Sequence, residues 1–466
     1  MSDWRERYEA VIGLEVHVQL RTRTKMFCGC EPSFGDEPNL HTCPVCLAHP
    51  GALPVVNEKA VGFALAIALA LGCEIAPRSI FHRKNYFYPD IPKGYQISQY
   101  DIPLATAGSL GDVRVHRVHL EEDTAKMIHV GESGRIQAST ESLVDFNRAG
   151  TPLVEIVTEP DLSGPAEARA WAQLLRETVR QTGASDVSME EGSLRCDANV
   201  SLRPAGSKAL GTKTELKNMN SFRFLERGIA AELERQAAVL DAGGQIDQET
   251  LHFDPVDGSI TSLRSKEYAH DYRYLPEPDL VPLAPTDEMI AAAGASLGEL
   301  PADRERRYTE HGLTEAAARQ LAFDPELAAE VDGILAADPG LEPRLVANWI
   351  LNDLTAARRQ LSKPDATVGP TDHVYLLGAL AAKELSHQAA RQVLDELVEN
   401  GGVPAEIVER LGLGGAEDSS ELEAIVEQAL AENAEAAEKV RAGKAGAVGP
   451  IVGAVMKATK GRADGG

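Results

Sequence analysis

Four cysteines lie close together in two pairs, Cys28-Gly29-Cys30 and Cys43-Pro44-Val45-Cys46. Two close pairs of thiolates are ligands that Zn²⁺ prefers, and four thiolates fill its tetrahedral coordination shell. The spacing therefore predicts a structural rather than a catalytic zinc site, because a full shell leaves no position for a substrate. Free thiols or another metal are the alternative interpretation.

Acidic side chains also recur on the polar faces of expected strands. Apolar and polar residues alternate strictly over residues 11–20, so Glu15 and His17 project from the same face of that strand. Glu155 lies inside the apolar run 152–157, where a carboxylate is costly unless it is paired or bound to a metal. These positions are candidates for a metal site.

The same pattern returns in three later places. Asp197 alternates with apolar neighbours in residues 195–202, Glu215 alternates with Thr212, Thr214 and Leu216 in residues 212–217, and Glu121-Glu122-Asp123 follows a basic strand. Carboxylates combined with one histidine suit Mg²⁺ that is held jointly with substrate phosphates. For any single pair an ordinary solvated strand face is the alternative, but the recurrence on several strands favours a site.

Residues 83–99 are basic, aromatic and rich in amides, which suits either a phosphorylated or nucleotide ligand or a packed loop. The chain has no G-x-x-x-x-G-K-[ST], G-x-G-x-x-G or G-x-S-x-G motif. If the chain binds ATP, we therefore expect a less common nucleotide-binding fold. The sequence also shows no amidase nucleophile.

The elements that must position these residues change in type along the chain. Strands are expected at 11–20, 153–157, 195–202, 212–217 and 260–264, and helices at 61–73, at 165–181 and from Ser221 to Gly243. Beyond Pro285 the strand signals end and helical periodicity continues to Asn400, followed by glycine pairs at 401–402 and 414–415.

We therefore expect an α+β fold in which an N-terminal mixed-sheet domain precedes an all-helical connector and a small helical tail domain. The expected boundaries are 1–290 for the catalytic domain with a zinc-binding insertion at 28–46, 291–404 for the helical domain and 405–466 for the tail domain. The length of 466 residues suits about three domains.

Charge is distributed unevenly over this acidic chain, whose formal net charge is −25. Residues 415–438 contain eight acids and no Lys or Arg, whereas residues 439–466 contain six basic residues and one acid. A basic tail favours contact with RNA phosphates, and a solvated charge run is the alternative. The chain start has no apolar signal core and no apolar stretch is long enough to span a bilayer, so we expect a cytoplasmic protein without a membrane partner.

In several stretches that include these candidate residues, the sequence resembles the B subunit family of the heterotrimeric tRNA-dependent amidotransferases. The matching stretches follow the family's order and are residues 11–18, 83–99, 120–123, 145–157, 189–199, 217–221 and 271–279. The tail differs from the family pattern at Pro450 and Ala454, where an aromatic or aliphatic residue and Gln are usual. The resemblance implies a cradle-shaped N-terminal domain, a helical domain and a tail domain that contacts tRNA.

The resemblance also implies roles for individual residues. His17, Glu122 and Glu155 would bind a stable Mg²⁺, and Glu15, Asp197 and Glu215 would bind a second, ATP-associated metal. Lys84 and Lys93 would border the end of an ammonia path. The four cysteines match the zinc-bearing branch of the family.

The activity implied is that of an ATP-dependent C–N ligase. It phosphorylates the side-chain carboxylate of Glu-tRNA(Gln), Asp-tRNA(Asn) or both, and amidates it with ammonia from a glutaminase A subunit, while a small C subunit completes the heterotrimer. Three alternatives stay open: the archaeal two-subunit enzyme specific for Glu-tRNA(Gln), a non-catalytic tRNA-binding scaffold, and a stand-alone ATP-dependent amide ligase. The archaeal enzyme normally carries a large insertion for which this chain has no room.

Overall fold

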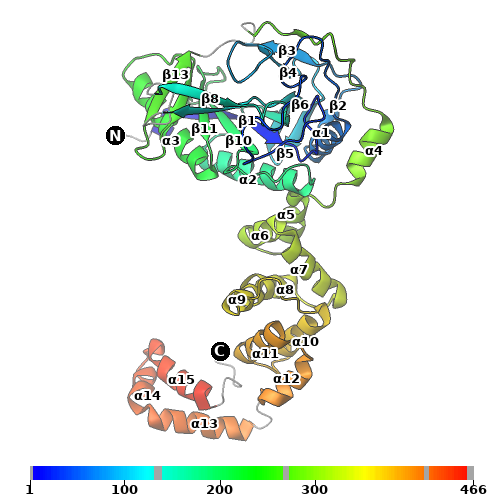
Figure 1. Ribbon diagram of the computed structural model, residues 1–466. Coiled ribbons are helices and arrows are strands. Elements are labelled where there is room, and N and C mark those ends of the chain that lie inside the picture. Colours follow the sequence, from blue (N-terminus) through cyan, green and yellow to red (C-terminus); the bar gives the residue numbers. More distant parts are fainter. Residues whose placement is uncertain (1–3, 131–138, 266–271, 414–418, 459–466) are drawn as a thin grey trace. The chain divides into compact units, whose positions relative to one another are not determined.

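The computed structural model describes residues 4–130, 139–265, 272–413 and 419–458. It divides into two compact units, Met1–Ala302 and Asp303–Gly466. Every strand among the described residues belongs to the first unit, and the described part of the second unit is helical (Figure 1). This confirms the expected α+β class. The three domain boundaries expected from the sequence stay a prediction.

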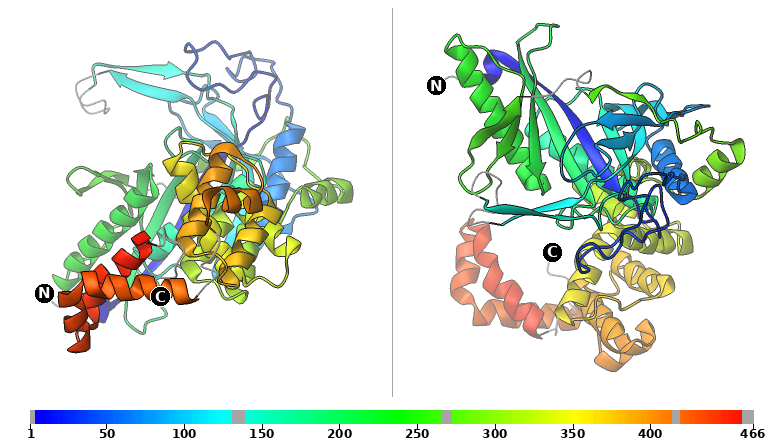
Figure 2. Two further views of the ribbon diagram at one scale, coloured as in Figure 1. Left: turned by 90° about the horizontal axis from the view of Figure 1, so that it is seen from below. Right: turned by 45° about the horizontal axis from the view of Figure 1, so that its top comes forward.

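A nine-stranded sheet forms the centre of the first unit, with the strand order β13-β12-β11-β10-β1-β9-β6-β5-β2. The strands are β1 (Tyr8–Gln19), β2 (Glu74–Ile75), β5 (Ala105–Leu110), β6 (Val113–Glu122), β9 (Pro152–Thr158), β10 (Leu194–Pro204), β11 (Thr214–Met219), β12 (Glu249–Phe253) and β13 (Ile260–Ser265). β1 pairs antiparallel with both β9 and β10. The first strand of the chain therefore lies inside the sheet, as the blue ribbon in the right-hand view of Figure 2 shows.

The alternation read from the sequence of β1 separates the two faces of this sheet. Ile12, Leu14, Val16 and Val18 are all at most 2% exposed and belong to the main hydrophobic core. The helices that bury this face are α1 (Glu58–Ala70), α2 (Pro165–Gln181) and α3 (Phe222–Asp241), which lie along one side of the sheet in Figure 1. The opposite face is left for polar side chains.

The starts of these helices follow from local chemistry. The side chains of Asn57 and Ser221 cap α1 and α3 by accepting hydrogen bonds from the backbone N–H groups of Ala60 and Phe224. Pro165 occupies the first turn of α2, where its missing N–H costs nothing. The helix expected at 165–181 is confirmed, as are the strands expected on β1, β9, β10, β11 and β13.

Two smaller sheets stand beside the large one. One joins β14 (Leu275–Pro276), β3 (His82–Asn85) and β4 (Tyr95–Ser98), and the other is the hairpin of β7 (Lys126–Val130) and β8 (Glu141–Asp145). β3 and β4 therefore bring the basic, aromatic stretch 83–99 into a sheet, where β4 packs near β6. Helix α4 (Asp287–Ala295) packs against α1 near the end of this unit.

The second unit contains two hydrophobic cores among its described residues, and its helices follow one another along the chain. They are α5 (Pro301–Glu310), which begins at the unit boundary, α6 (Glu315–Phe323), α7 (Pro325–Ala337), α8 (Pro343–Asn348), α9 (Thr355–Gln360), α10 (Pro370–Ala381), α11 (His387–Asn400), α12 (Pro404–Leu411), α13 (Ser419–Glu432), α14 (Ala434–Arg441) and α15 (Gly449–Ala458). A π-helical turn, Trp349–Leu354, connects α8 to α9.

The tail sequence fits these helices despite its departure from the family pattern. Pro450 lies in the first turn of α15, where proline is compatible with a helix, and Ile451 joins Ala429 and Ala437 in the smallest core. Ile407 and Leu413, in contrast, are buried in the larger core of this unit. Across the described residues, no helix combines the length and the apolar character needed to cross a membrane.

Candidate functional site

The strand register gathers polar side chains on the open face of the nine-stranded sheet. His17 of β1 lies opposite Glu155 of β9 and opposite Arg195 of β10, while Glu155 also lies opposite His119 of β6. Directly opposed residues on antiparallel strands project from the same face. The result is one continuous row, Arg195–His17–Glu155–His119, across four strands.

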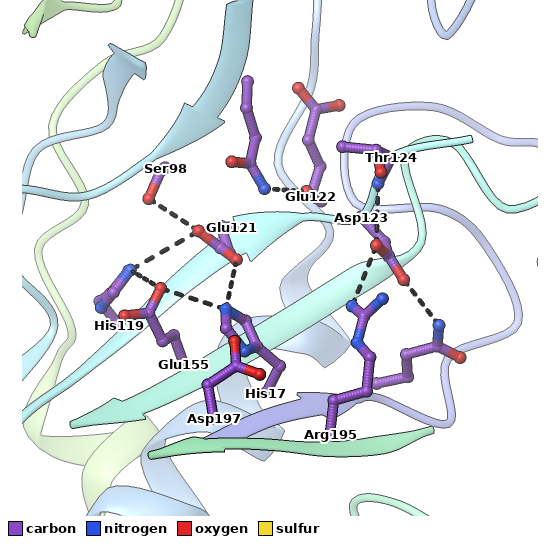
Figure 3. A network of polar contacts seen from close by, with 12 residues as sticks. His17, Ser98, His119, Glu121, Glu122, Asp123, Thr124, Glu155, Arg195 and Asp197 are labelled. Atoms are coloured by element: carbon purple, nitrogen blue, oxygen red, sulfur yellow. Dashed lines mark hydrogen bonds and ion pairs between the residues drawn. The ribbon is translucent and has the colours of Figure 1, made fainter. Parts of the chain in front are cut away.

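Two histidines and two glutamates of this face form a compact cluster (Figure 3). His17 Nε2 lies 3.6 Å from Glu121 Oε1 and 3.5 Å from Glu155 Oε2. His119 Nε2 lies 3.4 Å from Glu155 Oε2 and 3.7 Å from Glu121 Oε2. The hydroxyl of Ser98 donates a hydrogen bond of 3.0 Å to Glu121 and fixes its orientation.

Electrostatic balance allows these groups to be charged although they are buried. Burial alone would lower the pKa of both histidines, but the adjoining carboxylates outweigh it and raise the pKa of His17 and of His119. Burial likewise opposes ionisation of Glu155, yet His119 and His17 hold its pKa well below the usual range. The pKa of Glu121 is lowered in the same way, against its burial, by His119 and His17. The cluster therefore holds two carboxylates ionised in a region of low dielectric.

This arrangement also suits a hard cation. One ligand atom from each of His17, Glu121 and Glu155 can be chosen so that all three lie within 4.8 Å of one another. One imidazole nitrogen and two carboxylate oxygens leave room for water or phosphate oxygens in an octahedral Mg²⁺ shell. A metal at this position would replace the proton on His17, because a ligating imidazole must be neutral.

Glu122, which the family resemblance placed with His17 and Glu155, is not brought to them. It projects from the opposite side of β6 to Glu121, and its Oε1 accepts hydrogen bonds from Lys93 Nζ at 2.5 Å and from the backbone N–H of Ile97 at 2.9 Å. The reason is the two-residue period of a strand, which turns adjacent glutamates to opposite faces.

The sequence reasoning missed His119 as a site residue, and it named Glu121 only within the run Glu121-Glu122-Asp123 without making it a metal ligand. Over Val118-His119-Leu120-Glu121 apolar and polar residues alternate, and Val118 and Leu120 are fully buried in the core. The alternation was therefore a usable signal that His119 and Glu121 share the polar face.

A second acidic group continues along the same face on β1, β10 and β11. Lys217 Nζ lies 2.6 Å from Asp197 Oδ2 and 3.4 Å from Glu215 Oε1. The amide of Asn199 donates a hydrogen bond of 2.9 Å to Glu15 Oε1. The three acids expected to bind an ATP-associated metal thus lie on adjacent strands, where Lys217 contacts Asp197 and Glu215 and Asn199 contacts Glu15. Among the described residues they do not form a group whose ligand atoms all lie within 4.8 Å of one another. Their role as metal ligands stays a prediction.

Members of both groups, His17 and Glu121 from the first and Asp197 and Lys217 from the second, line one large cavity with a volume of about 1060 Å³. Among its lining residues are His17, Lys84, Glu121, Asp123, Arg195, Asp197 and Lys217. At its edge Asp123 accepts hydrogen bonds from Gln19 at 2.7 Å and from Arg195 at 3.0 Å. A cavity of this size has room for a nucleotide together with an aminoacyl group.

The two lysines expected near an ammonia path lie at different cavities. Lys84 lines the large cavity beside Glu121, with its ammonium 5.0 Å from the centre of the Tyr272 ring. Lys93 pairs with Glu122 and lines a separate cavity of about 150 Å³ next to Cys28. The two lysines therefore line two different cavities of this chain.

The four clustered cysteines come together as the spacing predicted. Their Sγ atoms all lie within 4.8 Å of one another, and those of Cys43 and Cys46 are 3.9 Å apart. Lys25 is buried beside them, with its ammonium 3.8 Å from Cys46 Sγ and hydrogen-bonded to the carbonyl of His41. Four cysteine sulfurs this close together form a possible metal site, and their number fits the tetrahedral coordination of Zn²⁺.

Comparison with known families agrees with this geometry. Residues 10–291 match the family model described as the GatB/GatE catalytic domain, and residues 335–466 match the model described as the GatB domain. The chain belongs to the GatB family. The first GatB match contains every candidate ligand named above, and the family resemblance read from the sequence is confirmed.

Individual GatB relatives match over almost the whole chain. The B subunit of the aspartyl/glutamyl-tRNA(Asn/Gln) amidotransferase of Frankia casuarinae is 53% identical, over 99% of this chain and 94% of the relative. The proteins of the same name from Geotalea uraniireducens and Thermobifida fusca are 47% and 49% identical, each over 98% of this chain and over 97% and 92% of their own lengths.

Proposed function

We propose that this chain is the component of an ATP-dependent tRNA amidotransferase that activates and amidates a side-chain carboxylate on tRNA. The substrates are Glu-tRNA(Gln), Asp-tRNA(Asn) or both, and the products are Gln-tRNA(Gln) and Asn-tRNA(Asn). Support comes from the family and the names of its members. The observation that carries the proposal is the buried cluster of His17, His119, Glu121 and Glu155, of which His17 and Glu121 line a large cavity.

The chemistry requires activation because oxide is a very poor leaving group. Transfer of the γ-phosphoryl group of ATP to the carboxylate gives an acyl phosphate and ADP. Ammonia then forms the C–N bond, and the C–O bond breaks with its electron pair leaving on phosphate. Mg²⁺, when bound, neutralises the negative charge on the phosphoryl oxygens.

His17, Glu121 and Glu155 are the residues that hold the stable Mg²⁺, with Glu121 in place of Glu122. Their ligand atoms share one small volume, and His119 and Ser98 orient the two carboxylates through contacts of 3.4 and 3.0 Å. By the family resemblance Glu15, Asp197 and Glu215 would hold the ATP-associated metal, and Lys217 bridges Asp197 and Glu215 in the structure. Next to them the Lys217 ammonium, whose pKa Asp197 and Glu215 raise against the effect of burial, faces the phosphates as a permanent cation.

The remaining parts of the assembly follow from what this chain lacks in sequence. No amidase motif is present, so the ammonia comes from glutamine hydrolysis in a partner A subunit, and a small C subunit completes the heterotrimer. Water must be kept away from the acyl phosphate, which favours a closed path for ammonia. The four cysteines hold a structural Zn²⁺, and the basic end of the chain contacts the tRNA.

Reconstitution tests this proposal directly. The trimer, supplied with glutamine and ATP, is expected to amidate Glu-tRNA(Gln), Asp-tRNA(Asn) or both, and to release ADP only when an aminoacyl-tRNA is present. Binding of tRNA without ATP cleavage would identify a scaffold instead. Amidation by this chain without partner subunits would identify a stand-alone ligase.

A further inference from the structure

One stretch that matches the family motif, residues 271–279, has no part in the mechanism so far, although most of it is held firmly against the site. Asp271 lies outside the described residues. Glu277 is buried and receives two hydrogen bonds from the guanidinium of Arg83, at 2.7 and 2.8 Å. β14 also pairs with β3 in register, so Leu275 lies opposite Arg83. The stretch is therefore fastened to β3, the strand that carries Lys84.

The start of this stretch is bent in a way that needs support. Arg273 has a φ of +46°, which is uncommon for a residue with a side chain. Asn85, the residue after Lys84, donates from its amide to the carbonyls of Tyr272 and Arg273 at 3.1 and 2.8 Å. Such a bend persists because these hydrogen bonds hold the backbone on both sides of it.

Two tyrosines are fixed by this bend. The Tyr274 ring stacks on Tyr100, with a centroid distance of 4.2 Å and an angle of 6° between the planes. Tyr272 meets Tyr274 edge to face at 6.1 Å and presents its ring to the Lys84 ammonium at 5.0 Å. The aromatic group is thus stacked together beside Lys84, which itself lines the large cavity.

Lys84 differs from two other cations that line this cavity. Lys217 is paired with Asp197 and Arg195 is paired with Asp123. The Lys84 ammonium has no hydrogen bond or ion pair with any residue that the structure describes, and it lines the same cavity as Glu121. An aromatic ring attracts a cation by a cation–π interaction and does not accept a conventional hydrogen bond from it. The three N–H donors of Lys84 therefore stay available to a ligand.

We propose that Asn85, Tyr272 and Tyr274 are positioning residues that hold the Lys84 ammonium beside the carboxylate cluster, where it binds an anionic oxygen of the activated substrate. The ligand is the phosphoryl group of the acyl phosphate, so this inference rests on the proposed function. As ammonia attacks, the C–N bond forms, the C–O bond breaks onto phosphate, and one ammonia proton passes to the released phosphate. Lys84 donates hydrogen bonds throughout and transfers no proton.

The test uses the reconstituted trimer with either glutamine or ammonium chloride as the nitrogen source. Lys84→Met is expected to lower kcat for amidation by about a hundredfold with both sources, the effect of removing one preorganised donor to an oxyanion. Tyr272→Leu is expected to lower kcat by about tenfold, and Tyr272→Phe, which keeps the ring, to stay within about twofold of the wild type. Lys59→Met is the matched control, because Lys59 also sits over a ring, that of Phe63 on α1, outside the cavity.

Glutaminase activity in each variant trimer reports whether the assembly is intact. Recovery of Lys84→Met by ammonium chloride would show that Lys84 serves ammonia delivery, and would overturn the proposal. Equal rates for Tyr272→Leu and wild type, or equal losses for Tyr272→Leu and Tyr272→Phe, would overturn the positioning role. A wild-type trimer that is inactive with both nitrogen sources would instead contradict the proposed function itself.

Discussion

Two neighbouring glutamates in β6 show how strongly the pleat of a strand determines function. Glu121 contacts His17 and His119 on the open face, whereas Glu122 pairs with Lys93 on the other side. Both side chains are buried and both are acidic, so composition cannot distinguish them. Their contacts do, because each face of the strand meets a different part of the molecule.

Substituting each of these two glutamates separately is the sharpest test of which one is a ligand of Mg²⁺. Glu121→Gln removes a ligand charge and is expected to weaken Mg²⁺ binding by at least about tenfold, with loss of tRNA-dependent ATP cleavage. Glu122→Gln is the matched control with the same change of charge, and its Mg²⁺ affinity is expected to stay within about twofold of wild type. Calorimetric titration with Mg²⁺ measures both, and the opposite ranking would restore Glu122 as the ligand.

The cysteine cluster gives a second prediction at this scale. The purified chain is expected to contain one zinc ion per molecule, and replacing Cys43 and Cys46 with Ser is expected to remove it and lower the thermal midpoint. Cys73→Ala is the control, since Cys73 is buried elsewhere in the core. Metal analysis after preparation without chelator gives the answer, and a zinc-free wild type would contradict the site.

Residue types and spacing were enough to predict part of the site. The four cysteines needed only sequence proximity, His17 was marked by the alternation along its strand, and Glu155 was marked by the cost of a carboxylate in an apolar run. The pairing of His17 with Glu121 depended on the order of strands in the sheet, which no local pattern contains. The family resemblance assigned Glu122 to the site, whereas the structure places Glu121 beside His17.

At the scale of elements, the π-helical turn Trp349–Leu354 has a buried polar contact that the sequence did not indicate. The indole N–H of Trp349 donates to Nδ1 of His373 at 3.0 Å, and His373 is 1% exposed. Burial, with a smaller effect from Arg358, lowers the pKa of His373 to about 4. The imidazole is therefore neutral in the folded chain and accepts the indole hydrogen bond.

This contact predicts a loss of stability in acid. The unfolded chain takes up a proton on His373 below a pKa of about 6.5, whereas the folded chain does so only near a pKa of about 4, so stability is full above the first value and falls as pH decreases towards the second. The expected loss between pH 7 and pH 5 is about 2 kcal/mol.

Hydrogen exchange in α8 and the π-helical turn measures this effect. His373→Gln keeps an acceptor for the indole of Trp349. In this variant the free energy of opening measured by hydrogen exchange is expected to lose the decrease of about 2 kcal/mol between pH 7 and pH 5. His311→Gln replaces an exposed histidine of the same unit and is the control. An unchanged pH dependence in His373→Gln would contradict the assignment.

Regular elements were predicted better than their assembly. The helix at 165–181 and the helix capped by Ser221 were correct because proline, the cap and the apolar period all point to the same start. The two-residue strands β2 and β14 were not expected, since so short a run carries no period. The parallel pairing of β11 and β12, with α3 between them in the chain, is likewise a property of the whole sheet.

At the scale of the whole molecule, the end of the chain is predicted to bind tRNA through phosphate contacts. The larger core of the second unit contains Ile407 and Leu413, so a cut at residue 405 would damage that core as well as the tail. We therefore propose to truncate after Leu413. The truncated trimer is expected to show a higher KM for aminoacyl-tRNA and a weaker dependence of KM on salt, because fewer counterions are released on binding.

A substitution variant separates charge from structure in the same region. Replacing the exposed Lys439, Arg441, Lys444 and Lys457 with Gln keeps α14 and α15 and removes four of the basic groups. It is expected to reproduce most of the change in KM while the kinetics for ATP and glutamine stay the same. An unchanged KM for tRNA over a salt series, in both variants, would show that the tail is a solvated extension.

The central position of β1 has a consequence for the synthesis of the protein. β1 leaves the ribosome before its partner strands β9 and β10. Its register with β10 runs from Tyr8 opposite Pro204, so both edges of β1 cannot be fully covered until residue 204 has been made. During that interval an apolar strand with unpaired N–H and C=O groups is available to other nascent chains. Chains stalled before β10 are therefore expected to depend on chaperones and to aggregate without them. Chains stalled beyond Phe253, the end of β12, contain both β9 and β10 and can already pair both edges of β1.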